Sequence, residues 1–218
     1  MVRLFLWAVG LVAVAALVAC SSPTPAVPLG DPKALLAEGR LALDRQDFDL
    51  AIQKLQETSR ADPQSVEAHF LLGNAYTKKD QWPEAEKSYL AALKLDANHV
   101  DARSNLGFVY YQSRKLDAAE KEFRQALALT PNDAEIHYNL GGVLAANNRY
   151  EEAVSEFRQA TQLDPQLAEP YLGLGSVYSQ LGRRDEAIAA LRTYLGLASD
   201  PTWRAQAEQM LRTLEAQR

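Results

Sequence analysis

Residues 66–99 read VEAHFLLGNAYTKKDQWPEAEKSYLAALKLDANH. The glycine of this stretch belongs to a series that recurs every 34 residues, at Gly39, Gly73, Gly107, Gly141 and Gly175. Two more columns keep the same spacing: alanine at Ala51, Ala85, Ala119, Ala153 and Ala187, and a large apolar residue at Leu55, Tyr89, Phe123, Phe157 and Leu191. A fixed period of this length is the signature of a repeat architecture, so it organises the chain.

Each repeat is predicted to form two helices. Apolar residues fall at i, i+3, i+4 and i+7 in two stretches, which a polar break such as Lys79-Asp80-Gln81 separates. Pro83 fits the first turn of the second helix, where a missing N–H does no harm. A glycine inside a helix costs about 1 kcal/mol relative to alanine. We expect close approach of the two helices, with Gly73 against Ala85, to offset that cost.

These columns resemble the tetratricopeptide repeat, and the resemblance covers five units: 32–65, 66–99, 100–133, 134–167 and 168–201. It implies an all-α fold, a right-handed superhelical solenoid of five helical hairpins. The pattern departs from the family at Glu38, where leucine is usual, and at Ala97, where a proline closes other units. Unit five has Tyr194 and Ser199 instead of a small residue and proline. Terminal units of such arrays are often atypical.

A capping helix is predicted for residues 202–218, starting at Asp200 and Pro201, because an open end of a stacked array needs a polar cover. Its apolar face carries Trp203, Ala207, Met210, Leu211 and Leu214, and its other face, expected to meet water, carries Arg204, Glu208, Arg212 and Glu215. The apolar stripe is interpreted as core. The alternative is that it forms a docking surface for another protein.

Residues 1–19 have the layout of a secretory signal peptide. Arg3 precedes a run of 16 apolar or glycine residues, from Leu4 to Ala19, which is shorter than the roughly 20 residues that span a bilayer. Leu17-Val18-Ala19-Cys20 resembles the lipobox of bacterial lipoproteins. That resemblance implies lipid modification of Cys20 as the mature N-terminus, with the Pro/Ser-rich residues 20–31 as a tether. The alternative is an uncleaved anchor helix.

Composition and motifs argue against several classes of function. There are 23 Lys and Arg against 28 Asp and Glu, a net charge of −5, so nucleic acid is not expected as a partner. The single cysteine excludes an internal disulfide and a cysteine-based zinc site. His69 and His137 lie on different hairpins and are expected to pack, while His99 is expected in a turn. No catalytic motif is present, so we expect no enzyme, no cofactor and no metal.

The first helix of each unit in such a superhelix lines a concave face that serves for binding. Carrying the family's groove positions onto this sequence gives Phe70, Asn74, Lys78, Ser104, Asn105, Phe108, Tyr111, Tyr138, Asn139, Gly142, Leu172, Ser176 and Gln180. An amide both donates and accepts hydrogen bonds, so Asn74, Asn105 and Asn139 are candidates for a ladder along an extended peptide. The alternative is that they only solvate an open groove.

Acidic residues recur at the second position of four units, as Glu67, Asp101, Glu135 and Glu169. In a first helical turn they compensate the helix dipole; where they also face the groove they disfavour acidic ligands. The carboxylate clamp of chaperone-binding family members is not carried over, because Phe70, Glu135 and Asn139 replace its basic residues. The partner expected is a protein or peptide with a neutral or basic extended segment.

The sequence therefore predicts a lipid-anchored scaffold or adaptor, not an enzyme. It would face away from the cytoplasm in a bacterial cell envelope and bind an extended segment of a partner during assembly of envelope complexes; Ser21 after Cys20 is compatible with the outer membrane. Two alternatives remain open. One is a signal-anchored repeat protein that recruits a membrane enzyme or transporter. The other is a glycan-binding or hydrolytic helical protein, which the aromatic groove residues would permit.

Overall fold

The computed structural model describes residues 30–216, and all regular structure in that range is α-helical. The predicted all-α repeat solenoid is confirmed. In chain order the helices are α1 (Pro32–Asp44), α2 (Phe48–Ala61), α3 (Val66–Lys78), α4 (Trp82–Leu95), α5 (Val100–Gln112), α6 (Leu116–Leu129), α7 (Ala134–Ala146), α8 (Tyr150–Leu163), α9 (Glu169–Gln180), α10 (Arg184–Leu197) and α11 (Pro201–Ala216). None of these helices combines the length and apolar character that crossing a bilayer requires. The predicted signal peptide and Cys20 lie outside the described residues.

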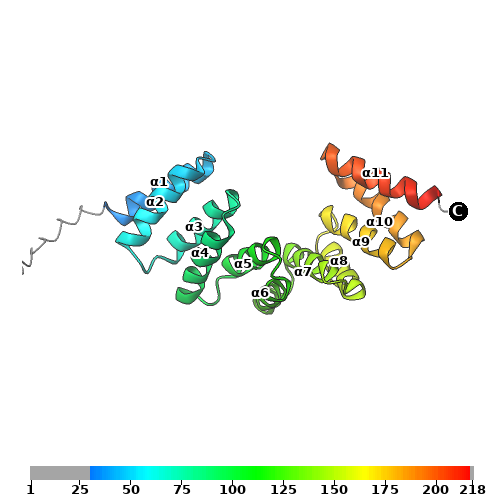
Figure 1. The fold of residues 1–218 in the computed structure, drawn as a ribbon, viewed down its shortest axis with the longest axis horizontal. Coiled ribbons are helices and arrows are strands. Elements are labelled where there is room, and N and C mark those ends of the chain that lie inside the picture. Colours follow the sequence, from blue (N-terminus) through cyan, green and yellow to red (C-terminus); the bar gives the residue numbers. More distant parts are fainter. Residues whose placement is uncertain (1–29, 217–218) are drawn as a thin grey trace, which may run out of the picture.

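The hairpins stack in sequence order along an arc, with α1 and α11 at its two ends (Figure 1). The two helices of each hairpin pack together, and the second helix of one hairpin packs on the first helix of the next. First helices also touch one another, α1 with α3, α3 with α5, α5 with α7 and α7 with α9, whereas second helices of residues 30–216 lack comparable mutual contacts. The first helices therefore lie on the inner side of the curve and line a concave face.

Side-chain caps and left-handed turn residues fix where the helices begin. Four first helices have an N-cap residue whose side chain accepts a hydrogen bond from a backbone N–H of the first turn. These N-caps are Asp31, Ser65, His99 and Asp133, and each satisfies an N–H that has no partner within the helix. His99, expected in a turn, is thus the N-cap of α5. Between the helices of each hairpin one residue has a positive φ, at Gln46, Asp80, Arg114, Asn148 and Gly182. This left-handed residue belongs to the turn that reverses the chain between the two helices.

The atoms nearest to the glycine column belong to the column of large apolar residues. A Cβ added to Gly73 would lie 2.5 Å from Tyr89 Cε1, so the expected contact of Gly73 with Ala85 is wrong as the explanation of this glycine. The reason is that the Tyr89 ring reaches across from α4 and covers the glycine backbone. Phe157 does so twice: a Cβ on Gly141 would lie 2.7 Å from its Cδ1, and one on Gly173 in the next hairpin 2.7 Å from its Cζ.

Adjacent glycines of α7 offer a matched test of this packing. We expect Gly141→Ala to destabilise the protein by about 1–3 kcal/mol, because the new methyl group must displace the buried Phe157 ring. Gly142→Ala is expected to stabilise it by about 0.5–1 kcal/mol, because nothing lies within 4 Å of a Cβ there and alanine favours the helix. Urea unfolding of both variants measures the difference. Equal effects would contradict the role assigned to Gly141.

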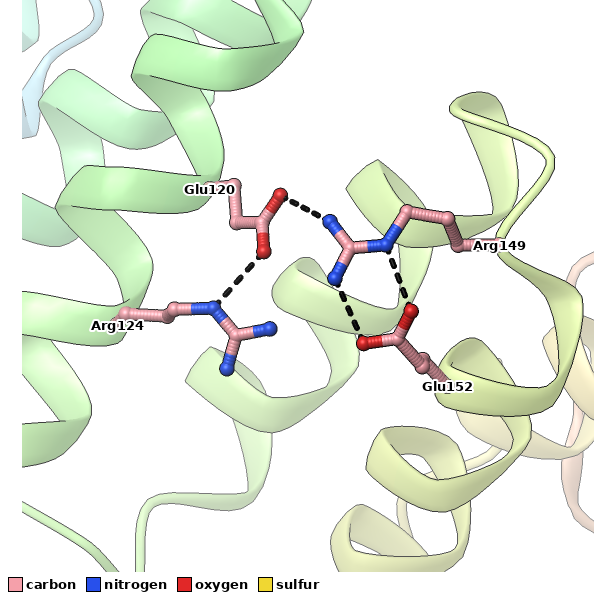
Figure 2. Close-up of polar contacts among 4 residues, drawn as sticks. All are labelled: Glu120, Arg124, Arg149 and Glu152. Carbon is pink, nitrogen blue, oxygen red and sulfur yellow. Dashed lines mark hydrogen bonds and ion pairs between the residues drawn. The ribbon is translucent and has the colours of Figure 1, made fainter.

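Cationic residues near the start of second helices link consecutive hairpins through ion pairs. Lys79 pairs with Asp49, Lys115 with Glu86, Arg149 with Glu120 and Arg183 with Glu151. Figure 2 shows the contact made by Arg149. Its Nη1 lies 2.6 Å from Glu120 Oε2 of the preceding hairpin, while its Nε and Nη2 donate to the two oxygens of Glu152. Glu120 also accepts from Arg124 Nε at 2.9 Å within α6. Arg149 lowers the pKa of the Glu152 carboxyl chiefly by hydrogen bonding.

Arg149→Gln is expected to lower the melting temperature more than Arg124→Gln, because only Arg149 joins two hairpins. The difference should shrink as the salt concentration rises from about 0.05 M to about 1 M, since screening shortens the range of interaction between exposed charges. Thermal melts followed by circular dichroism measure both variants. An equal decrease in melting temperature for Arg124→Gln, or a decrease that does not depend on salt, would contradict the role of Arg149 in joining the two hairpins.

The cap helix α11 is present, but two of its residues differ from expectation. Ala207 and Leu214 are buried, whereas Trp203 is 52% exposed, so placing Trp203 in the core is wrong. It lies in the first turn, before the helix settles onto α10, and Asp200 caps that turn by accepting from the Thr202 and Trp203 N–H groups. Arg204, expected in water, instead donates to the carbonyls of Leu195 and Ala198. It satisfies free carbonyls at the end of α10.

Candidate functional site

The concave face contains two separate hollows. The N-terminal hollow, of about 470 Å³, is lined by Leu43, Asp44, Phe48, Asn74, Thr77, Lys78, Tyr89, Asn105 and Phe108. The C-terminal hollow, of about 360 Å³, is lined by Tyr138, Gln166, Leu167, Ala168, Glu169, Leu172, Tyr194, Leu197, Ala198, Ser199, Asp200 and Trp203. Four predicted groove residues lie in the first hollow and two in the second.

A hydrogen-bond network anchored on a buried tyrosine organises the N-terminal hollow. The Tyr89 hydroxyl donates to Asn74 Oδ1 over 2.7 Å, and Asn105 Nδ2 donates to the same oxygen over 3.0 Å. Thr77 Oγ1 lies 3.1 Å from the Tyr89 hydroxyl. The Asn74 oxygen is therefore occupied by the chain itself. Asn74 Nδ2 and Asn105 Oδ1 take no part in this network, so one donor and one acceptor remain for a ligand.

Burial widens the pH range over which the Tyr89 hydroxyl of this network stays protonated. It raises the pKa of Tyr89 to about 12, partly offset by hydrogen bonds from Thr77 and Asn105. The hydroxyl is therefore neutral and remains a donor throughout the physiological range. Around it Lys78 and Asp44 supply one charge of each sign, so the N-terminal hollow has no strong preference for a charged ligand.

The remaining predicted groove residues divide by burial. Phe70 packs against His99 with the rings tilted by 38° and their centroids 4.6 Å apart, and Tyr111 packs half-buried against the core; both support the fold of the concave face. Ser104 and Asn139 are half-buried, while Ser176 and Gln180 are exposed. These four line neither hollow.

Several hollow residues were missed by sequence reasoning. Leu43, Asp44 and Phe48 come from the first repeat, onto which no groove position was carried. Tyr194 belongs to the second helix of the last repeat, whose predicted groove residues all lie on its first helix, and Asp200 and Trp203 belong to the start of the cap, which is predicted to cover the end of the array. The available signals were the departure from the family pattern at Tyr194 and the tryptophan in the first turn of α11.

The histidines and the acidic column have mainly structural partners. His69 and His137 bind through Nε2 to the carbonyl oxygens of Pro63 and Pro131, at 3.1 and 3.0 Å, and so brace the turns between repeats. Within residues 30–216 no group of side chains is placed to hold a metal ion. Glu67 pairs with Arg40. Of the four acidic-column residues, Glu169 alone lines either hollow.

A curved stack of equivalent helical hairpins with a lined concave face defines a helical-repeat protein. Two family models, both described as tetratricopeptide repeat, match the chain, one at residues 36–100, 76–123 and 104–168 and the other at 144–208. Together they cover well over half of the sequence. The chain belongs to the tetratricopeptide repeat family.

Solved structures share this architecture. A crystal structure of MamA protein is 25% identical over 78% of this chain and 98% of that one, with a TM-score of 0.70. MamA from Desulfovibrio magneticus RS-1, residues 41 to the end, is 22% identical over 85% and 98% of the two chains, with a TM-score of 0.68. YrrB, described as a TPR protein with an unusual peptide-binding site, is 23% identical over 82% and 92%, also with a TM-score of 0.68. No curated protein matches the chain.

Proposed function

We propose that this protein is a non-catalytic scaffold that binds an extended segment of a partner protein along its concave face. The observation that carries the proposal is the Tyr89–Asn74–Asn105 network. It fixes one half of each amide and leaves Asn74 Nδ2 and Asn105 Oδ1 for a ligand. An extended peptide supplies the complementary groups, a free carbonyl and a free N–H, at each residue.

The surroundings of the two amides also suit a peptide. Phe48 and Phe108 line the same hollow and offer apolar surface to the side chains of a peptide. Phe108 also makes an edge-to-face contact with Trp82, with ring centroids 6.2 Å apart. Because these groups are already fixed by the fold, less conformational entropy is lost on binding. The peptide-binding site named for YrrB, which shares this fold, supports the same interpretation of the concave face.

The proposal extends to the partner's charge and to the cellular address. A neutral or basic segment is favoured, because the charged residues lining the two hollows are three acids and one lysine. The lipobox-like residues 17–20 support lipid attachment at Cys20 and a place in a bacterial cell envelope, where a tethered scaffold would serve the assembly of envelope complexes.

Peptide binding is tested by selecting a phage-displayed library of random peptides on the full chain and measuring the affinity of the enriched peptides. We expect Asn105→Ala with Asn139→Ala to weaken binding about tenfold, a loss of about 1.4 kcal/mol, and we expect Asn105 to account for most of it because Asn139 lines neither hollow. The matched control is Asn98→Ala with Asn132→Ala, two exposed asparagines in turns at the same separation in the sequence. Absence of enriched peptides, or equal affinities of the two double variants, would contradict the proposal.

Lipid attachment is tested by mass spectrometry of the protein isolated from a bacterial host. We expect an acylated mature chain that begins at Cys20, and we expect Cys20→Ser to remain an uncleaved precursor, because the thiol is the atom that carries the lipid. A chain that retains an unmodified Met1 would show an anchor helix instead.

A further inference from the structure

The two hollows of the concave face differ in charge. In the N-terminal hollow Asp44 is balanced by Lys78, whereas the charged residues lining the C-terminal hollow are two acids, Glu169 and Asp200. Ion pairs join many carboxylates of this chain to lysine or arginine, but within residues 30–216 neither of these two belongs to such a pair. The charged residues that line the C-terminal hollow are therefore acidic and have no ion-pair partner in that part of the chain.

The acids of the C-terminal hollow are accompanied by aromatic rings from three different helices. Tyr138 comes from α7, Tyr194 from α10 and Trp203 from α11. Trp203 is 52% exposed although it belongs to the apolar face of a capping helix. In Figure 1 the first turns of α11 lie toward the inner side of the arc, where a ligand in the concave face would pass. An exposed indole beside carboxylates offers its negative ring face to a cation.

The negative field of the carboxylates reaches the rings. Burial raises the pKa of Tyr138 and Tyr194, and the Glu169 carboxylate raises both further. Asp200 adds to the effect on Tyr194, whereas Arg204 opposes it. The Arg204 guanidinium keeps its positive charge, but its Nη1 donates to the carbonyls of Leu195 and Ala198 and it forms no ion pair with Glu169 or Asp200, so both carboxylates remain open to a cation.

The backbone holds the Asp200 carboxylate in place. Asp200 Oδ1 accepts from the N–H groups of Thr202 and Trp203 at 2.9 and 3.0 Å, and its second oxygen takes no part in that cap. A carboxylate fixed in this way needs little reorganisation to bind a cation. The apolar side chains of Leu172 and Leu197 line the same space and suit the methylene stem that lysine and arginine place below their charge.

We propose that the C-terminal hollow binds the cationic side chain of a lysine or arginine in the partner's extended segment, between the Trp203 ring and the Glu169 and Asp200 carboxylates. This inference rests on the proposed function and deepens it, since it turns a general preference for neutral or basic segments into one required basic residue. That residue lies toward the α11 end of the concave face. Charge complementarity excludes an acidic side chain from this position.

The test is an NMR titration of the full chain that follows the indole N–H of Trp203, assigned by Trp203→Phe. The probes are acetyl-Gly-Xaa-Gly-amide tripeptides with Xaa as Lys, Arg, Gln or Glu. We expect saturable shifts with Lys and Arg at concentrations on the order of 1 mM, an affinity suited to a single side chain, and no comparable shift with Gln or Glu. In Glu169→Gln with Asp200→Asn, binding should weaken at least tenfold. Asparagine still caps α11, so the fold is retained.

Glu135→Gln is the matched control, because Glu135 holds the position in unit four that Glu169 holds in unit five, yet lines neither hollow; it should bind the Lys tripeptide as the unaltered chain does. Four outcomes would overturn the inference: equal shifts with the Gln tripeptide, unchanged binding in the double variant, no shift up to about 20 mM, or self-association that the double variant abolishes, which would assign the hollow to a second copy. The two experiments separate this inference from the proposed function. If peptides are selected but Trp203 does not respond to the Lys and Arg tripeptides, this inference alone is wrong. If Trp203 responds but no peptides are selected, the proposed function alone is wrong.

Discussion

The contact of a buried large side chain with a glycine on the facing helix controls the geometry of this protein. In each hairpin the second helix places a ring or a leucine where the glycine would have its Cβ, and Phe157 does this for Gly141 and Gly173 in two consecutive hairpins. Interiors of proteins are close-packed, so this filling fixes the distance between the helices. Because the contact recurs once in every repeat, the hairpins stack with a constant offset. The concave face and its hollows follow from that regularity.

Polar contacts serve two purposes in this protein. Ion pairs such as Arg149 with Glu120 join successive hairpins, and each exposed pair contributes little by itself. In the N-terminal hollow the polar groups are constrained by hydrogen bonds to one another. Tyr89 has its ring packed over Gly73 and its hydroxyl bonded to Asn74, so a single residue belongs both to the packing that spaces the helices and to the network that positions the binding groups.

Much of the fold was accessible from the sequence, because every repeat shows the same pattern and five copies make it unambiguous. The partner of Gly73 was not, because periodicity tells which residues face inward but not which side chain reaches the glycine. The C-terminal hollow was predicted only in part, through Tyr138 and Leu172. Trp203 and Arg204 lie where the array ends, and rules derived from a following repeat do not apply there. The turn positions with a positive φ could not be predicted, because residues as different as Arg114 and Gly182 occupy them.

The first hairpin, unlike the central ones, packs against a hairpin on one side only within residues 30–216. In a linear array each unit draws stability from its neighbours, so an end unit opens at lower free-energy cost than a central one. That end unit supplies Leu43, Asp44 and Phe48 to the N-terminal hollow. One wall of the hollow is thus subject to local unfolding. A ligand that contacts this wall together with Asn74 and Asn105 would stabilise the folded state of the first hairpin.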